Sequence, residues 1–275
     1  MSPSATPKAQ AMVMGGKEKD IIVEIEDGIC TITLNRPRHL NVFNEETLND
    51  FFDILEDVSK NKKVKILILL SACEKAFTAG ADIKKMVKMG PEEGRAWSQL
   101  GHKIARKLET IPQPVIIGIN GYTLGGGVEF ACACDIRIAS EDSIFSQPEI
   151  DIGVIPGWGG TQRLSRIVGI ARAKEMIYTG KRIDAEEARE IGLVNHVVSK
   201  ESLEEAVMTM AKTMAAKGKL ALFDAKKSIN RLHDSFLPEG LKYEIDRWTE
   251  LFETHDQKEG MRAFLEGREP RFEDR

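Results

Sequence analysis

Two short apolar runs constrain the fold of this chain more than any other feature of its sequence. Residues 64–70 and 115–119 are almost wholly apolar, and turn-forming or polar residues bound both runs. Runs of this length are typical of buried strands in a parallel sheet and are far shorter than the roughly 20 residues that span a bilayer. Helical patterns precede both runs, so the sequence predicts an α/β core.

Periodicity, turn signals and capping residues predict the remaining elements. Asp27-Gly28 is a hairpin-turn signal, and Asn44 and Asp184 are suited to cap helix N-termini. The predicted elements, in chain order, are a β-hairpin at 21–34, helices at 48–58 and 91–109, short strands at 135–139 and 143–145, a helix from Thr161 toward Arg172, a helix at 185–190 and a strand at 193–198.

The chain divides into three predicted regions. Residues 1–19 are rich in Ser, Pro, Ala, Gly and Lys and are expected to form a flexible tail. Residues 20–200 are expected to form the α/β core with the active site. Residues 201–275 show helical patterns with many large apolar side chains, so we expect this region to pack on the core or on another subunit.

Composition and charge argue against several classes of function. The formal net charge of −4 leaves no basic excess to bind a phosphate backbone. The four cysteines form no C-x-x-C pair, and the N-terminus lacks the continuous apolar stretch of a secretion signal. We therefore expect a reduced, cytoplasmic protein without a metal site, a nucleic-acid partner or a membrane anchor.

Two loops of small residues follow predicted strands. Residues 120–127 end in three glycines before a predicted helix, and residues 76–84 turn sharply at a sheet edge. Bare backbone at a helix start can bring N–H groups close to a ligand oxygen, although the same glycines also suit a tight packing turn. Together, the two loops could present two N–H donors to one carbonyl oxygen, as in an oxyanion hole.

Glu129 and Glu149 are the candidate acid–base pair. Glu129 stands among apolar residues, and Glu149 follows the short segment FSQP at 145–148. A carboxylate among apolar neighbours is desolvated, which raises its pKa and makes it a credible proton carrier. The alternative for Glu129 is a solvated residue in the first turn of a helix, stabilised by the helix dipole.

The loop at 153–163 carries Trp158 among four glycines, which suggests a shaped wall rather than a hinge.

Nucleophilic catalysis has little support. The chain has no G-x-S-x-G elbow, and none of its five histidines stands in a motif that activates serine or cysteine.

These motifs, in this order and spacing, resemble the crotonase superfamily, also called the enoyl-CoA hydratase/isomerase family. The resemblance runs from about residue 21 to the C-terminus. It is carried by LNRP at 34–37, FTAGAD at 77–82, NGYTLGGGVE at 120–129, CD at 134–135, FSQPE at 145–149 and GVIPGWGGTQRL at 153–164. It implies a spiral of ββα units with a C-terminal helical region that builds homotrimers or homohexamers.

The resemblance also implies a site. The N–H groups of Ala81 and Gly126 would form an oxyanion hole for a thioester oxygen, typically worth about 3–4 kcal/mol per donor. Glu129 would orient and deprotonate a water molecule, and Glu149 would exchange the proton at C2. Members with both acids are similar to hydratases, so reversible hydration of a 2-enoyl-CoA is expected. Alternatives are double-bond isomerisation, thioester hydrolysis and RNA binding by a relative of the fold.

Further expectations concern the substrate. Coenzyme A would enter as part of the acyl-CoA substrate, and no separate cofactor is implied. Trp158 replaces a smaller residue common in this loop, so we expect short acyl chains of C3 or C4. Gly267 stands where some hydratases offer a lysine to the nucleotide, and Arg268 is a possible substitute. The implied substrate and CoA contacts are Arg38, Ala81, Asp82, Ile83, Lys84, Gly126, Gly157, Trp158 and Phe264.

Overall fold

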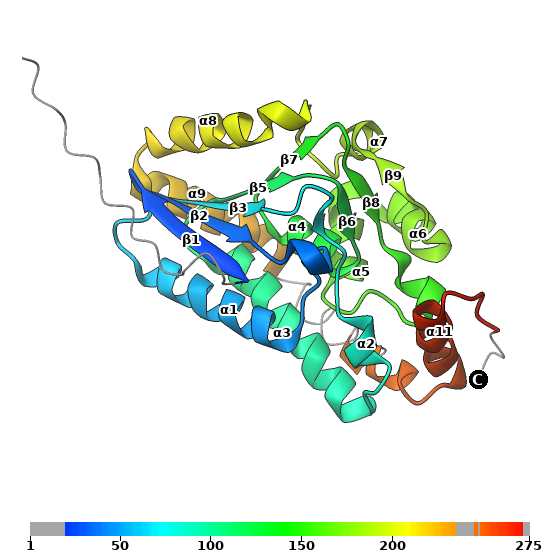
Figure 1. Cartoon of the computed structure of the whole chain (residues 1–275). Helices are drawn as coiled ribbons and strands as arrows, with labels where there is room; N and C mark the ends of the chain where they lie inside the picture. The colour runs from blue at the N-terminus through cyan, green and yellow to red at the C-terminus, as the bar shows by residue number, and fades with distance from the viewer. Residues whose placement is uncertain (1–19, 235–244, 247, 272–275) are drawn as a thin grey trace, which may run out of the picture.

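The computed structural model describes residues 20–234, 245–246 and 248–271, which form two β-sheets surrounded by helices (Figure 1). The predicted flexible tail at 1–19 lies outside the described residues. The larger sheet has the strand order β1-β2-β3-β5-β7-β10 and the smaller sheet the order β4-β6-β8-β9. The predicted α/β class is therefore confirmed.

The larger sheet begins with the predicted hairpin. Its strands pair antiparallel from Ile21 with Leu34 to Glu26 with Ile29, and Asp27 and Gly28 turn with φ values of 50° and 80°. All other neighbours in this sheet run parallel. Its strands are β1 (Ile21–Glu26), β2 (Ile29–Leu34), β3 (Ile66–Ser71), β5 (Val115–Ile119), β7 (Ile136–Ser140) and β10 (His196–Val198).

The smaller sheet supplies the second strand of each repeating unit. β4 (Ala76–Thr78), β6 (Tyr122–Leu124) and β8 (Ile144–Ser146) pair in parallel, and β9 (Ile183–Asp184) joins antiparallel. The chain thus passes three times from the larger sheet to the smaller one, through β3-β4, β5-β6 and β7-β8. This repetition is the predicted spiral. It places the C-terminal ends of β4, β6 and β8 side by side.

Helices cover both faces of the larger sheet (Figure 1). On one face lie α1 (Glu45–Lys60) and α3 (Pro91–Thr110), and the predicted cap of α1 is confirmed because Asn44 Oδ1 accepts the Thr47 N–H at 2.8 Å. On the other face, α8 (Leu203–Ala215) packs on isoleucines of β2, β3, β5 and β7. The apolar runs are strands buried on both faces, as predicted.

The helix predicted from Thr161 toward Arg172 is wrong as one element. α5 (Gly160–Val168) ends at Gly169, whose φ of 81° suits glycine, and α6 (Ile170–Thr179) begins directly after it. The predicted helix at 185–190 is confirmed as α7 (Ala185–Glu190), with Asp184 Oδ1 accepting the Glu187 N–H at 2.8 Å.

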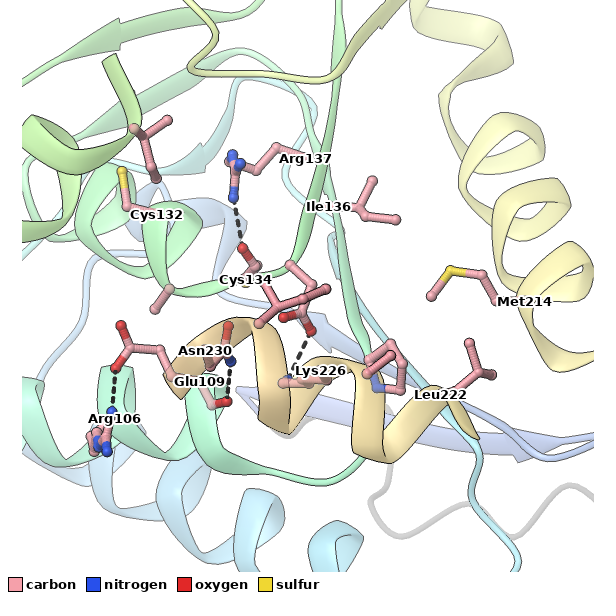
Figure 2. Close-up of a pocket in the computed structure, with 16 residues that line it drawn as sticks. Arg106, Glu109, Cys132, Cys134, Ile136, Arg137, Met214, Leu222, Lys226 and Asn230 are labelled. Atoms are coloured by element: carbon pink, nitrogen blue, oxygen red, sulfur yellow. Dashed lines mark hydrogen bonds and ion pairs between the residues drawn. The ribbon is translucent and has the colours of Figure 1, made fainter. Parts of the chain in front are cut away.

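The C-terminal helix α9 (Lys219–Asp234) packs on the core through two polar side chains (Figure 2). Lys226 is 7% exposed, and its Nζ lies 2.8 Å from Asp135 Oδ2 and donates to the carbonyl oxygens of Leu108 and Gln113. Asn230 Nδ2 donates to the Glu109 carbonyl oxygen at 2.9 Å. α9 therefore satisfies carbonyl groups at the end of α3.

The last described helix, α11 (His255–Glu266), lies beside η2 (Pro148–Ile152), a 3₁₀ turn that follows β8. Thr254 Oγ1 caps it by accepting the Gln257 N–H at 3.1 Å. No helix among the described residues is both long and apolar enough to span a membrane. Within the single chain, α9 and α11 both pack on the core.

We predict that Lys226→Met lowers the free energy of unfolding by about 3 kcal/mol, because it leaves the Asp135 carboxylate and two buried carbonyl groups without their cation. Lys227→Met is the matched control. Lys227 is exposed on the same helix, so its loss should change stability by less than about 0.5 kcal/mol. Chemical denaturation measures both, and equal effects would show that the buried contacts of Lys226 do not anchor α9.

Candidate functional site

Two cavities of similar volume lie in the described part of the chain. The first, about 430 Å³, opens where the C-terminal ends of β4, β6 and β8 meet, and both candidate glutamates line it. The second, about 410 Å³, lies between α9 and the end of α4 (Gly126–Ala133) (Figure 2).

The second cavity offers little chemistry. Arg137 donates to the carbonyl oxygens of Leu193 and Cys134 at 2.7 and 2.6 Å, and Lys226 has the three acceptors described above. Burial raises the pKa of the Cys132 thiol to about 12, so it stays protonated at neutral pH. Arg137 and Lys226, the cations of the second cavity, already form hydrogen bonds or ion pairs within the protein. We therefore take the first cavity as the candidate site.

The N–H group of Ala81 faces this cavity because of the pairing of its neighbours. The Phe43 N–H donates to the Gly80 carbonyl oxygen at 2.8 Å, and the Asp82 N–H donates to the Phe43 carbonyl oxygen at 3.0 Å. Alternation along an extended segment turns the intervening N–H of Ala81 away from Phe43. Because Ala81 lines the cavity, we expect this N–H group to be available there.

Gly126 brings a second N–H group to the same place, because it opens α4 and the first N–H groups of a helix have no partner within it. A Cβ atom on Gly80 would lie 2.8 Å from the Leu124 carbonyl oxygen and 3.6 Å from the Gly126 nitrogen. The two loops therefore touch along bare backbone.

Within the described residues, neither Ala81 nor Gly126 donates its N–H in a hydrogen bond. Two uncommitted donors beside one cavity match the expected oxyanion-hole arrangement.

Glu129 is buried, with 2% exposure, in the first turn of α4. Its Oε1 accepts the N–H groups of Trp158 and Gly160 at 2.8 and 2.7 Å. A solvated helix-start glutamate, the alternative interpretation of this residue, is excluded. The two backbone donors hold the carboxylate at the wall of the cavity.

Glu149 reaches the cavity from η2 and is half-buried. A Cβ atom on Gly125 would lie 2.9 Å from Glu149 Oε1, so only glycine at that position leaves room for the carboxylate. Gln147 donates to the Gly125 carbonyl oxygen at 2.8 Å and holds the strand end against the loop. The two glutamates thus line one cavity, Glu129 from α4 and Glu149 from η2.

Trp158 forms a wall of the cavity, as its sequence context suggested. It is 2% exposed, and its ring stacks on Phe130 with centroids 5.1 Å apart and 14° between the planes. The ring of Trp97, in α3, lies against the indole with the two centroids 5.7 Å apart. The indole and the aromatic rings behind it therefore form an apolar part of the cavity wall.

The expected substrate contacts divide into two groups. Ala81, Ile83, Gly126, Gly157, Trp158 and Phe264 all line the cavity. Asp82 instead caps α2 (Ile83–Met86), accepting the Lys85 N–H at 3.3 Å, while Arg38 and Lys84 are exposed outside the lining.

Gly267 and Arg268 have structural roles at the end of α11. Gly267 ends the helix with a φ of 66°. Arg268 holds both Glu259 carboxylate oxygens, at 2.6 and 2.9 Å, and also pairs with Glu266. The Arg268 guanidinium lowers the pKa of Glu259 to about 2. Because its guanidinium is already committed to two carboxylates, Arg268 is a poor substitute for a phosphate-binding lysine.

Sequence reasoning missed lining residues that lie outside the quoted motifs. Trp248 covers Gly157, where a Cβ atom would lie 2.6 Å from the indole Nε1. Gly157 itself was the available sequence signal. A residue without a side chain, in a loop that forms a wall, indicates that a bulky side chain packs against its backbone. The lining residues outside those motifs and outside the expected contacts are Leu40, Met86, Trp97, Asp151, Ile152, Arg182 and Trp248.

Comparisons with known proteins identify the family. The family model described as enoyl-CoA hydratase/isomerase matches residues 24–275. The short-chain-enoyl-CoA hydratase of Clostridium acetobutylicum is 42% identical over 90% of this chain and 95% of its own length, and the crotonyl-CoA hydratase of Syntrophomonas wolfei is 41% identical over 92% and 98%.

A solved structure agrees as well. The crystal structure of an enoyl-CoA hydratase from Bacillus anthracis is 39% identical and superposes with a TM-score of 0.77, covering 94% of this chain and 100% of its own. Sequence motifs, fold and comparisons lead to one conclusion: the chain belongs to the enoyl-CoA hydratase/isomerase family.

Proposed function

We propose that this protein catalyses the reversible addition of water to a short-chain 2-enoyl-CoA, giving the 3-hydroxyacyl-CoA. The observation that carries the proposal is the meeting of two carboxylates, Glu129 and Glu149, with two uncommitted N–H donors, Ala81 and Gly126, at one cavity. One carboxylate suffices to move a proton. Two acids beside an oxyanion hole suit a reaction in which water and carbon exchange protons.

The thioester carbonyl oxygen accepts the N–H groups of Ala81 and Gly126 in the proposed reaction. The Glu129 carboxylate takes a proton from water while the water oxygen bonds to C3. The electron pair of the double bond shifts toward the thioester oxygen as an enolate, and the fixed donors stabilise the charge. The carboxylic acid of Glu149 then gives a proton to C2, and proton exchange between the two carboxyl groups restores the starting state.

The proposed preference for short acyl groups rests on Trp158. Its indole, backed by Phe130 and Trp97, occupies the apolar end of the cavity, where a longer chain would extend. The names of the two curated relatives, a short-chain-enoyl-CoA hydratase and a crotonyl-CoA hydratase, support the same substrate class. Coenzyme A would be part of the substrate.

We also propose a homotrimer or a homohexamer in the cytoplasm. Ile170, Tyr178 and Ile229 are 66%, 67% and 65% exposed in the single chain, and large exposed apolar residues suit subunit contacts. The four cysteines are free and buried, which suits a reducing compartment. Light scattering should give a mass near three or six chains, and a monomer at micromolar concentration would refute the assembly.

The purified protein should consume crotonyl-CoA, with loss of the ultraviolet absorbance of the conjugated thioester and formation of 3-hydroxybutyryl-CoA. Glu129→Gln and Glu149→Gln should each lower kcat by about 10²-fold or more, because each removes a proton-transfer group. Glu141→Gln is the control, since Glu141 is exposed and outside the cavity. Full activity of Glu149→Gln would disprove the acid–base role, and a shifted double bond or free CoA as product would indicate another reaction.

Activity should fall with acyl length. We expect kcat/KM for crotonyl-CoA to exceed that for trans-2-octenoyl-CoA by about tenfold or more, since burying additional methylene groups requires space that Trp158 occupies. Parallel assays with C4, C8 and C10 substrates measure this preference. Equal or higher kcat/KM on the longer substrates would contradict it.

A further inference from the structure

The indole of Trp158 lies between two glycines from different elements. A Cβ atom on Gly101, in the middle of α3, would lie 2.1 Å from both Cγ and Cδ1 of the indole. A Cβ atom on Gly126 would lie 2.3 Å from Cζ3, at the opposite edge. The five-membered ring therefore rests on Gly101, and the six-membered ring rests on the glycine that offers the second N–H donor.

The backbone of Trp158 has little freedom to adjust. Its N–H donates to Glu129 Oε1 at 2.8 Å, and its carbonyl oxygen accepts from Arg163 at 2.9 Å. The preceding carbonyl oxygen, of Gly157, accepts the Ser98 hydroxyl at 2.6 Å. Because these bonds fix the main chain, the space available to the side chain determines where the indole lies.

Gly101 provides that space from behind. It is buried within a 20-residue helix, yet it is absent from the cavity lining, so the indole separates it from the cavity. Glycine is among the poorest residues for a helix interior. The indole explains why glycine stands here, because any side chain at position 101 would overlap the Trp158 ring.

We propose that Gly101 is a specificity-determining residue. It forms a notch in α3 that seats the Trp158 indole and so fixes the depth of the acyl end of the cavity. A side chain at 101 pushes the ring toward Gly126 and into the space for the acyl group. This inference rests on the proposed hydration of short-chain enoyl-CoA and extends it to a residue that does not touch the substrate.

A double-mutant cycle tests the notch. The four proteins are the wild type, Gly101→Ala, Trp158→Leu and the double variant, each assayed for kcat/KM on crotonyl-CoA and trans-2-octenoyl-CoA and for Tm. Gly101→Ala alone should lower kcat/KM on crotonyl-CoA at least tenfold and lower Tm. Trp158→Leu should raise the C8-to-C4 activity ratio at least tenfold.

The decisive comparison is Gly101→Ala in the Trp158→Leu background. There the added methyl group meets no indole, so kcat/KM should change less than threefold. Tm should rise, because alanine favours a helix more than glycine. The change in the sign of the Tm effect is a result that a general role of Gly101 in helix packing would not produce.

Two outcomes would overturn the proposal. One is an equal loss of activity and Tm on adding Gly101→Ala to either background, and the other is wild-type activity and chain-length ratio in Gly101→Ala itself. If Gly101→Ala alone does not fold, a folded double variant supports the notch and an unfolded one refutes it. Absence of turnover by the wild type would instead contradict the proposed function. The Tm values of the four proteins would still test the notch.

Discussion

The candidate site depends most on the hydrogen bonds that Glu129 accepts. A buried carboxylate is costly unless donors replace its hydration, and here the N–H groups of Trp158, just before α5, and Gly160, its first residue, do so. Their approach requires a bare position, because a Cβ atom on Gly160 would lie 3.0 Å from Glu129 Oε1. The same bonds place Trp158, so one interaction sets both the acid group and the wall beside it.

The spiral explains why the other groups arrive at the same edge. Each passage from the larger sheet to the smaller one ends in a loop at the same end of a parallel strand. β4 leads to Ala81, β6 leads to Gly126 and β8 leads to Glu149. Three consecutive repeats therefore deliver two N–H donors and one carboxylate without any long-range loop, since the ends of parallel strands lie at one edge of a sheet.

Long apolar runs, caps and glycine turns were predictable from the sequence because their causes are local. The hairpin turn at Asp27-Gly28 and the cap at Asn44 each depend on a few adjacent residues. β4 and β6 were not predicted, since they lie within the segments interpreted as loops of small residues and show too little periodicity to identify a strand. Trp97 and Trp248 could not be placed at the cavity either, because their orientation depends on how α3 and the C-terminal region pack on the core.

The contribution of the C-terminal region to the cavity has a consequence for biosynthesis. Trp248 and Phe264 line the cavity, yet they follow every other lining residue in the sequence. Glu149 precedes Trp248 by 99 residues in the sequence, and Ala81, Gly126 and Glu129 lie earlier still. A nascent chain thus carries both glutamates and both N–H donors before the aromatic wall contributed by Trp248 and Phe264 has been synthesised.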